Sequence, residues 1–495
     1  MRAHDTGTQG AEVQGRTVRD RGGPGRGTPG RADIVIVGAG AAGLSLVLSL
    51  ARHGVLRPDR RTVLIDPGPD RTGPDEIGLD GTGPDGTGPD GTGPDGTGPD
   101  GTGQVGTDGP ASGTGPFDLR VWGFWDTARR PVLAGTGTVF PLVRTHASGR
   151  NRSLPSYPYR YRVVRGAELR SLTEAVLAEH PQVERLPGTV RSIVDGPDAA
   201  FVEHDGGVLE ARWVFDSVGL PAVRARPPAV MAFQGWEIRT DRRRLDERVP
   251  TLFDFRGLAP GCFGYQVPLG PGRALAEVTR IGPPDDTVLP DPEPYLREVL
   301  GLEGYEILRT EHGRLPLDPW HHRPTGRHTL AIGRPAGLLK ASSGFALARI
   351  QRDSAAVAQS LRRNGHPFAL PEPRWRHRLF DAAFLQAVLR DPPLLEKAFG
   401  VLAERPARLM RFLDEDSSLG QEVRIALEMP PGGFLRGGAR ALREAGRRKE
   451  EERSPKRDDC GGDRRTEQEI RLASGRSRYL PWQGHDPIKQ PTAAL

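Results

Sequence analysis

Three glycines near the start of the chain have the spacing of a phosphate-binding turn. Gly38, Gly40 and Gly43 follow the pattern G-x-G-x-x-G. In such a turn the first glycine permits a sharp bend, the second lets the backbone approach a pyrophosphate, and the third lets a helix pack closely on a sheet. The N–H groups and the positive dipole end of that helix favour a bound anion. The spacing therefore predicts a site for the pyrophosphate group of a dinucleotide.

The residues around these glycines predict the elements that would position them. The apolar, β-branched run 34–37 is typical of a strand buried on both faces, and apolar periodicity predicts a helix from about residue 42 to residue 53. A second strand, 61–65, ends at Asp66, whose carboxylate could accept hydrogen bonds from an adenosine ribose. The alternative is a glycine-rich turn that binds no nucleotide, and the complete strand, helix, strand and acid pattern argues against it. The predicted dinucleotide-binding residues here are Gly38, Ala39, Gly40, Ala41, Ala42, Gly43 and Asp66.

A second glycine-bearing turn occurs much later in the chain. An apolar strand over 329–333 enters a loop that contains Gly333 and Gly337, and a helix is predicted from about residue 345 to residue 361. A strand-to-helix turn at this point suggests that the chain returns to its first domain. We therefore expect Gly333 and Gly337 to contribute to the same cofactor site, with a helix N-terminus directed at the cofactor.

Aromatic residues cluster where the sequence becomes apolar again after residue 116. Trp122, Phe124 and Trp125 lie within four residues, in a chain that is only 6% aromatic. They could pack in a core, or they could form an aromatic wall for a long apolar ligand or a cation. Cores and ligand pockets have similar aromatic linings, so the residues themselves leave both interpretations open.

Composition limits the classes of protein to consider. Only 36% of the 495 residues are hydrophobic, because 65 glycines and 47 prolines dilute the chain, which predicts a globular core interrupted by disordered segments. The formal net charge of +6 permits attraction to anionic lipid or nucleic acid, but a solvated basic surface is the favoured interpretation. The two cysteines, Cys262 and Cys460, allow neither a disulfide framework nor a CxxC metal site, which fits a reducing cytoplasm.

Two segments are expected to be disordered. Residues 1–31 are rich in Gly, Arg and Thr and have no apolar signal-peptide core, so we expect the protein not to be secreted. The segment 67–116 contains four identical copies of GTGPD over 81–100, and turn-forming residues of this kind bury nothing, which predicts an insertion in a surface loop. No run reaches the eighteen or so apolar residues that span a bilayer, so any contact with a membrane is expected to be peripheral.

The remaining patterns predict an α/β fold with two sheets. Short alternating strands over 183–215 predict an antiparallel meander, and the strand ending at 213–219 resembles the last strand of two-dinucleotide-binding flavoproteins. Strands over 231–280 predict a second, mixed sheet.

The tail 432–495 could form a basic amphipathic helix on an anionic membrane, although a solvated or disordered tail is favoured. The expected organisation is a leader (1–31), a Rossmann-like dinucleotide-binding domain (32–66 and 117–230) interrupted by the insertion (67–116), a substrate-binding sheet (231–325), a return to the first domain (326–365), C-terminal helices (366–431) and the tail (432–495).

Several of these segments together resemble one family. The chain is similar to the flavoprotein-type lycopene β-cyclases of bacterial carotenoid synthesis over about 33–66 and 117–430. Ala336 and Ala341 depart from the residues usual in that family, as does the long insertion. The segments that carry the resemblance are VWGFWD (121–126), FQGWEIRT (233–240), TLFDFRG (251–257), GYQVPLG (264–270), RALAEVT (273–279), EHGRLPL (311–317) and IGRPAGLLKASSGFALARIQRD (332–353).

The resemblance implies a reaction without net redox change. Lycopene would be converted to γ-carotene and then to β-carotene by proton-initiated closure of each acyclic ψ-end. The cofactor would be FAD in its reduced form, with NAD(P)H as the reductant. The implied partners are lycopene, γ-carotene and the membrane surface that holds them, with neither nucleic acid nor metal. The implied location is the cytoplasm, in peripheral contact with the membrane.

The chemistry needs a carboxylic acid that stays protonated in an apolar, water-excluding site. The resemblance points to Glu277 as this acid, and the alternative is a structural salt bridge of Glu277 with Arg256 or Arg280. Other motif carboxylates are Asp126, Glu237, Asp254 and Glu311, of which Glu237 and Asp254 are the second choices. His312 is expected to be structural. The predicted substrate-binding residues are Trp122, Phe124, Trp125, Trp236 and Asp254.

Two other classes of function fit the same residues. A flavin-dependent monooxygenase or an isoprenoid reductase would use the same fold but consume NAD(P)H in proportion to product. A carotenoid-binding protein would keep the dinucleotide as a structural group and bind lycopene without converting it. Cofactor consumption and pigment products distinguish these alternatives.

Overall fold

The computed structural model describes residues 30–67, 116–127, 133, 135–219, 227–241, 245–414 and 417–453. Almost all of the leader and of the repeat insertion lies outside the described residues. So does the tail beyond Arg453, which includes Cys460. Residues 29–453 belong to one compact unit, and the following description concerns that unit.

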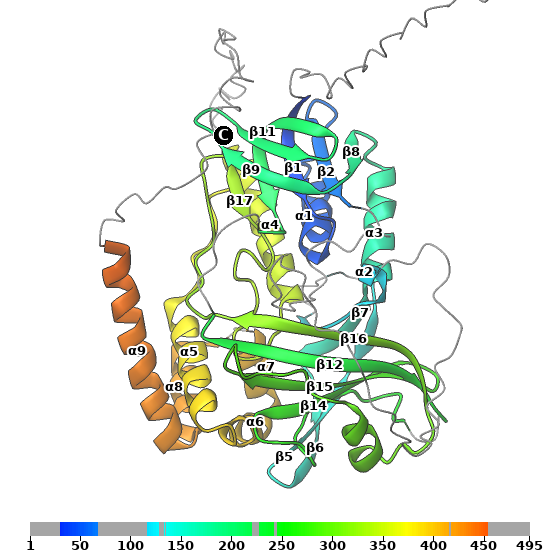
Figure 1. Cartoon of the computed structure of the whole chain (residues 1–495), viewed down its shortest axis with the longest axis vertical. Helices are drawn as coiled ribbons and strands as arrows, with labels where there is room; N and C mark the ends of the chain where they lie inside the picture. The colour runs from blue at the N-terminus through cyan, green and yellow to red at the C-terminus, as the bar shows by residue number, and fades with distance from the viewer. Residues whose placement is uncertain are drawn as a thin grey trace, which may run out of the picture. The chain divides into compact units, whose positions relative to one another are not determined.

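The first sheet is built around strand β1. Parallel strands flank it in the order β8-β2-β1-β11, and β17 pairs with the far end of β11, so the chain returns to this sheet after residue 325. Helices α1 and α4 pack against each other, and α3 packs beside α1 (Figure 1). The bounds are β1 (Gly30–Val37), α1 (Ala41–Arg52), β2 (Thr62–Asp66), α3 (Gly166–Ala178), β8 (Val183–Pro187), β11 (Gly207–Asp216), β17 (Thr329–Ala331) and α4 (Leu347–Asn364).

Alternation along β1 explains why its sequence is apolar at every position. Ile34 and Ile36 belong to the core formed with α1 and α4, while Val35 and Val37 belong to the core on the opposite face. A strand buried on both faces needs apolar side chains pointing in both directions. The predicted strand and the helix that follows it are confirmed.

The predicted meander over 183–215 is only partly correct. Strands β9 (Val190–Asp195), β10 (Ala200–His204) and β11 pair antiparallel, as expected. Strand β8, however, pairs parallel with β2. It follows α3, and a helix is the usual connection before a parallel strand.

The second sheet is mixed, as predicted, and has the strand order β16-β12-β15-β14-β13-β5-β6. The sequence predicts that residues 117–230 belong to the first domain, but β5 and β6 join the second sheet, because β5 pairs parallel with β13. Short alternating strands carry no mark of the sheet they join, so long-range pairing decided this. The bounds are β5 (Leu142–Ala147), β6 (Arg150–Pro155), β12 (Ala229–Arg239), β13 (Thr251–Asp254), β14 (Cys262–Gly270), β15 (Arg273–Gly282) and β16 (Glu306–Leu317).

Smaller elements connect the two sheets. Strand β7 pairs with β3 and β4 in a separate three-stranded sheet, and α2 contacts α3. A π-helix precedes β16 and packs near β14. The bounds are α2 (Pro116–Leu119), β3 (Val121–Thr127), β4 (Thr138–Phe140), β7 (Tyr159–Arg165) and the π-helix (Tyr295–Val299).

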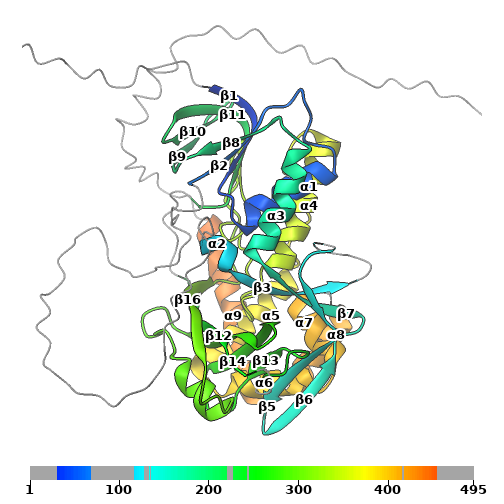
Figure 2. The ribbon, with the colours of Figure 1, turned by 90° about the vertical axis from the view of Figure 1, so that its right-hand side faces the viewer.

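The C-terminal helices pack on the second sheet (Figure 2). Phe253 of β13 stacks on Phe399 of α6 with ring centroids 3.9 Å apart, in a core that also contains residues of α5, α7 and α8. None of the described helices is both long and apolar enough to cross a membrane. The bounds are α5 (Trp375–Arg390), α6 (Leu394–Ala403), α7 (Pro406–Asp414), α8 (Leu419–Glu428) and α9 (Pro431–Arg453).

Helix α9 corrects the expectation of a disordered tail from residue 432. It is continuous over 23 residues and packs along α5. A Cβ atom on Gly437 would lie 2.5 Å from the carbonyl oxygen of Ala383, so the glycine allows close contact between the two helices. The Gly and Arg content that suggested disorder instead provides this contact and a charged outer surface.

Candidate active site

The turn between β1 and α1 has the shape that its glycines predict. A Cβ atom on Gly43 would lie 1.9 Å from the carbonyl oxygen of Gly38, so only glycine allows the helix to approach the turn this closely. At Gly40 a Cβ atom would meet nothing within 4 Å, which leaves open space beside the backbone at the N-terminus of α1. The turn therefore fits a pyrophosphate group, which Gly40 and the first N–H groups of α1 would hold.

Two other segments meet this turn. Asp66 ends β2, and one of its carboxylate oxygens lies 3.4 Å from the backbone nitrogen of Ala39. Gly333, after β17, adopts a positive φ of 65°, and a Cβ atom there would lie 2.6 Å from Cβ of Ala42. Gly337 instead packs on the ring of His321. Asp66 and Gly333 thus lie beside the turn, as a shared dinucleotide site requires, whereas Gly337 supports the loop.

A cavity of about 580 Å³ lies between β3, the second sheet and the loop that leads into α4. Its walls are mainly apolar and aromatic, with carboxylates and an arginine contributed by β15 and β16. The hydroxyl of Ser343, in the loop, is buried and has no hydrogen-bond partner among the described residues. The residues that line the cavity include Val121, Trp122, Met231, Phe233, Leu252, Phe253, Phe263, Tyr265, Glu277, Thr279, Arg309, Glu311, His312, Leu315, Leu339, Ser343 and Phe345.

Glu277 and Glu311 are brought to the same part of the cavity by strand register. Gly235 of β12 pairs with Glu277 of β15 on one side and with Glu311 of β16 on the other. Neighbouring strands lie about 4.8 Å apart, so the two backbones are about 10 Å apart with only a glycine between them. A Cβ atom on Gly235 would lie 3.2 Å from Cβ of Glu277. The absence of a side chain at Gly235 keeps the space between the carboxylates open.

The surroundings of Glu277 favour its protonated form. Burial, followed by the negative charge of Glu311, raises its pKa from 4.5 to about 8, against a hydrogen bond from the Thr279 hydroxyl (2.8 Å) that lowers it. Burial also raises the pKa of Tyr265, whose hydroxyl lies 2.6 Å from that of Tyr161. A carboxylic acid with this pKa can donate a proton near neutral pH.

The salt-bridge alternative for Glu277 is not realised. Arg256 instead binds Asp254 through two side-chain hydrogen bonds, of 3.0 and 2.6 Å. Arg280 lies an odd number of residues from Glu277 along β15, so its side chain leaves the opposite face of the strand. Among the described residues, no ion pair joins either arginine to Glu277.

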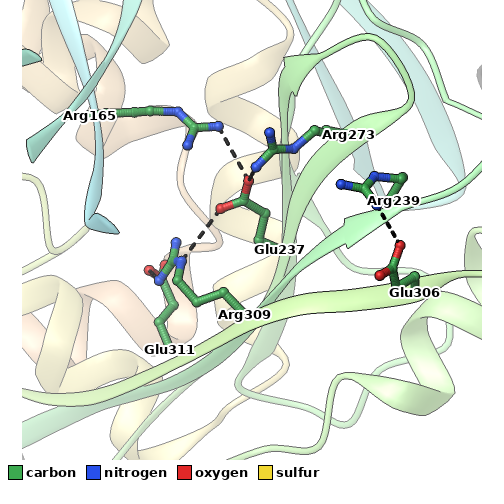
Figure 3. Close-up of polar contacts among 7 residues, drawn as sticks. All are labelled: Arg165, Glu237, Arg239, Arg273, Glu306, Arg309 and Glu311. Atoms are coloured by element: carbon green, nitrogen blue, oxygen red, sulfur yellow. Dashed lines mark hydrogen bonds and ion pairs between the residues drawn. The ribbon is translucent and has the colours of Figure 1, made fainter. Parts of the chain in front are cut away.

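Glu237 is surrounded by arginines, as Figure 3 shows. Arg165 and Arg309 lie 3.3 and 3.4 Å from its carboxylate oxygens, and Arg273 forms a closer ion pair. Burial would raise the pKa of Glu237, but the arginines outweigh it and hold the pKa below 4.5. Glu237 is therefore a charged structural group and unsuited to proton donation.

Arg309 connects this cluster to the cavity. Its Nη1 atom lies 2.6 Å from Oε2 of Glu311, while its Nε atom faces Glu237 (Figure 3). The ion pair places the Arg309 guanidinium on Glu311, next to the raised-pKa acid of Glu277. Glu277 and Glu311 thus lie at one register position of the sheet, the first hydrogen-bonded to Thr279 and the second paired with Arg309.

The other predicted substrate-binding residues are divided by their position along the strand and by strand alternation. Trp122 lines the cavity. Phe124 is buried in the core of the first domain, Trp125 packs on Tyr161 (5.0 Å between ring centroids), and Trp236 points away from the Gly235 face of β12. These three do not line the cavity. Phe124 shares a face of β3 with Trp122 but lies further along the strand, whereas Trp125 and Trp236 lie on strand faces opposite to those of Trp122 and Gly235.

Asp254 is likewise a structural residue. It is fully buried, and its carboxylate accepts hydrogen bonds from Arg256 and from the hydroxyl of Tyr295 (3.1 Å). It does not line the cavity. Asp126 also has a structural partner, because it forms a buried ion pair with Arg162 (3.0 Å).

Sequence reasoning missed the importance of Glu311 and of Phe233, Tyr265 and Phe345. The sequence contained a signal for Phe233 in its spacing from Gly235, whereas the position of Glu311 is fixed only by strand pairing. Phe233 and Gly235 are two residues apart and so share a face of β12, and Glu311 opposes Gly235 once the strands are paired. His312, expected to be structural, also lines the cavity. Within the described residues, no group of three His, Cys, Asp or Glu side chains gathers as metal ligands would.

Comparisons with known proteins identify a family and a fold. The family model described as "Lycopene cyclase protein" matches residues 108–437. A search of curated proteins finds no match. A geranylgeranyl bacteriochlorophyll reductase-like protein from Thermoplasma acidophilum is 13% identical, with a TM-score of 0.50 over 82% of this chain and 98% of that chain.

Two further solved structures are similar to a lesser degree. One is p-nitrophenol 4-monooxygenase from Pseudomonas putida, 13% identical, with a TM-score of 0.43 over 84% of this chain and 98% of that chain. The other is the rebeccamycin biosynthetic enzyme RebC with reduced flavin, 14% identical, with a TM-score of 0.45 over 83% of this chain and 78% of that chain. The predicted flavoprotein-type α/β fold, with a second mixed sheet and C-terminal helices, is confirmed.

Proposed function

Because this chain belongs to the lycopene cyclase protein family, we propose that it is a lycopene β-cyclase. It closes the ψ-ends of lycopene to β-ionone rings, through γ-carotene to β-carotene, and consumes no hydride overall. The observation that carries the proposal is the cavity in which Glu277, with a pKa of about 8, lies beside Glu311 and an apolar, aromatic wall.

Glu277 is the proton donor in this proposal. Its carboxylic acid gives a proton to the C1,C2 double bond at one end of the carotenoid, and the C5,C6 double bond attacks the resulting tertiary cation at C1. The apolar wall, which includes Phe233, Phe263 and Leu315, excludes the water that would convert the cation to an alcohol. Trp122 and Phe345 present aromatic groups that can stabilise positive charge.

Glu311 completes the acid–base chemistry. Its carboxylate, paired with Arg309, stabilises the ring cation and takes the proton from C6, which forms the β-ring double bond. Transfer of that proton from Glu311 to Glu277 restores the starting state, so no proton is gained or lost in a cycle. The position of Glu311 relative to the ring then determines which proton leaves.

The proposed cofactor is FAD, held by the β1–α1 turn, Asp66 and the loop at Gly333. In its reduced form it would supply an electron-rich ring that stabilises nearby positive charge, and NAD(P)H is the proposed reductant. The glycine turn, the open space at Gly40 and the unpartnered Ser343 hydroxyl support this assignment. Because carotenoids dissolve in lipid, we also propose that the protein works at the cytoplasmic face of a membrane, in peripheral contact with it.

Pigment analysis tests the activity and the acid together. The chain is expressed in cells that accumulate lycopene, beside Glu277→Gln and the matched control Glu306→Gln. Glu306 lies on the same strand as Glu311 but pairs with Arg239 (2.8 Å) outside the cavity. We expect β-carotene from the wild type and the control, and unchanged lycopene from Glu277→Gln with flavin still bound.

Other outcomes would contradict the proposal. Hydroxylated or reduced carotenoids formed with stoichiometric NAD(P)H use would favour a monooxygenase or an isoprenoid reductase. Lycopene that copurifies unchanged with the flavin-bound wild type would favour a carotenoid-binding protein. Full activity of Glu277→Gln would leave the cyclase proposal standing and remove Glu277 as the acid.

A further inference from the structure

Helices α8 and α9 each expose large apolar side chains. On α8, Leu419, Val423 and Leu427 are 62%, 48% and 80% exposed, and on α9, Leu435 and Leu442 are 72% and 57% exposed. Residues spaced by four or seven lie on one face of a helix. Each helix therefore presents an apolar stripe to solvent, and we call these five residues the apolar ridge.

Arginines accompany the ridge on α9. Arg436 and Arg443 each follow a ridge leucine directly in sequence, so they lie on the adjoining face of the helix. Arg440, Arg443 and Arg447 line a cavity of about 540 Å³ together with Gln386 of α5 and Glu444. Glu444 is already paired with Arg448 (3.1 Å). The cavity is therefore cationic, with arginines that can bind phosphate.

The opposite face of α9 fixes this orientation. Ala441 is fully buried, and a Cβ atom on Gly433 would lie 2.2 Å from the side chain of Leu394. With the close contact at Gly437, these residues hold α9 along α5 within the C-terminal helices (Figure 1). The helix cannot rotate to bury its leucines without losing this packing, so the ridge stays exposed.

We propose that α8 and α9 form the surface by which this protein docks on a bilayer containing anionic phospholipid. The apolar ridge enters the boundary between headgroups and acyl chains, and the arginine-lined cavity takes a lipid phosphate. Apolar residues beside arginines on a surface helix are the combination that binds anionic interfaces. The inference rests on the proposed function for its purpose, since the carotenoid must be taken from lipid, but its contacts are independent of the active site.

Vesicle flotation of the full chain tests the docking surface. Vesicles contain either phosphatidylcholine alone or phosphatidylcholine with phosphatidylglycerol. We expect binding to the anionic vesicles that weakens with salt, and little binding to the neutral ones. Lys and Arg residues near an anionic surface contribute about 1 kcal/mol each, so Arg440→Gln, Arg443→Gln and Arg447→Gln together should weaken binding on the order of a hundredfold.

Matched variants separate the ridge from general surface effects. Leu427→Glu with Leu435→Glu should abolish flotation, whereas Val288→Glu, at an exposed apolar residue of a loop, should not change it. All of these side chains are exposed or line an open surface, so thermal unfolding should be unchanged. Equal binding of the wild type to both kinds of vesicle, binding to neither, or a dimer that Leu427→Glu dissociates would overturn the proposal.

Activity in two media distinguishes this proposal from the proposed function. With lycopene in detergent micelles, the ridge and arginine variants should match the wild type, and with lycopene in anionic vesicles they should be slower in proportion to their lost binding. A wild type that binds anionic vesicles but converts lycopene in neither medium contradicts the cyclase function alone. Variants that keep wild-type rates in vesicles contradict the docking surface alone.

Discussion

Glu277 and Glu311 are register partners of the same residue, Gly235, from its two sides. They are 34 positions apart in the sequence, yet they face one cavity across a strand position without a side chain. Each has a different partner: Thr279 donates to Glu277, and Arg309 forms an ion pair with Glu311. Two chemically identical side chains therefore have different surroundings: burial raises the pKa of Glu277, and an arginine pairs with Glu311.

The pH dependence of turnover should report the protonation of Glu277. Its pKa of about 8 lies above the ordinary 4.5, so the acid is present below pH 8 and is lost as the pH rises through that value. We expect the rate with detergent-dispersed lycopene to fall about tenfold per pH unit above pH 8.

The raised pKa of Glu277 should also make the stability of the folded state depend on pH. Because the unfolded chain releases this proton near pH 4.5 and the folded chain near pH 8, the folded state should lose stability as the pH rises from about 4.5 to 8. Urea unfolding should show this loss in the wild type, and a pH-independent stability for Glu277→Gln across this range would confirm its source.

Replacing Glu311 should change the pH at which the turnover rate begins to fall. The groups that face Glu277 include Glu311 and Arg309 of β16, Tyr265 of β14 and Tyr161 of β7, and of these Glu311 is the carboxylate that raises the pKa of Glu277. In Glu311→Gln the falling limb should therefore shift to lower pH.

The products of Glu311→Gln provide an independent measurement. If Glu311 takes the C6 proton, its loss should slow ring closure by about 10²-fold or more and let protons leave from other carbons, so chromatography should detect isomeric rings. Glu306→Gln is the control. A role for Glu311 would be contradicted by a pure β-ring product that forms at the wild-type rate and with the wild-type pH dependence of that rate.

Alanine at Gly40 and at Gly43 should produce different defects. At Gly43 the new Cβ atom meets a backbone oxygen at 1.9 Å, so Gly43→Ala should destabilise the fold by about 1–3 kcal/mol. At Gly40, where φ is −75°, the Cβ atom enters open space, and the stability cost should be about 0.5–1 kcal/mol for the weaker N-cap. Gly40→Ala should nevertheless weaken FAD binding about tenfold or more, because it blocks the approach of a pyrophosphate. Flavin absorbance and thermal unfolding of the purified variants measure the two effects. Normal flavin binding by Gly40→Ala would argue against this turn as the cofactor site.

Asp254→Asn should affect stability and leave chemistry intact. The substitution weakens hydrogen bonds from Arg256 and Tyr295 to a buried carboxylate, and it should cost about 2 kcal/mol in the free energy of unfolding. The rate of the folded variant should stay within about twofold of the wild type, since Asp254 does not line the cavity. Denaturant titration and a turnover assay under native conditions check both values, and a large loss of rate without loss of stability would restore Asp254 as a functional residue.

The sequence by itself determined the features that depend on neighbours along the chain. The β1–α1 turn, with Asp66 ending the next strand, could be predicted because Gly38, Gly40 and Gly43 encode backbone geometry locally. The identity of Glu277 as a candidate acid followed from the resemblance of its strand to one family. The mixed second sheet followed from alternation. These features can be predicted without knowing which strands pair.

Only the tertiary structure decided which side chains share the cavity. Pairing placed Glu311 opposite Gly235, assigned β5 and β6 to the second sheet, and turned Trp236 to the face opposite Gly235. The reason is that a strand has two faces and a one-residue change of register exchanges them, so aromatic and acidic motifs of equal appearance can face a ligand or a core. Likewise, the Gly and Arg content of α9 suggested disorder until its packing on α5 supplied the burial that a single helix lacks.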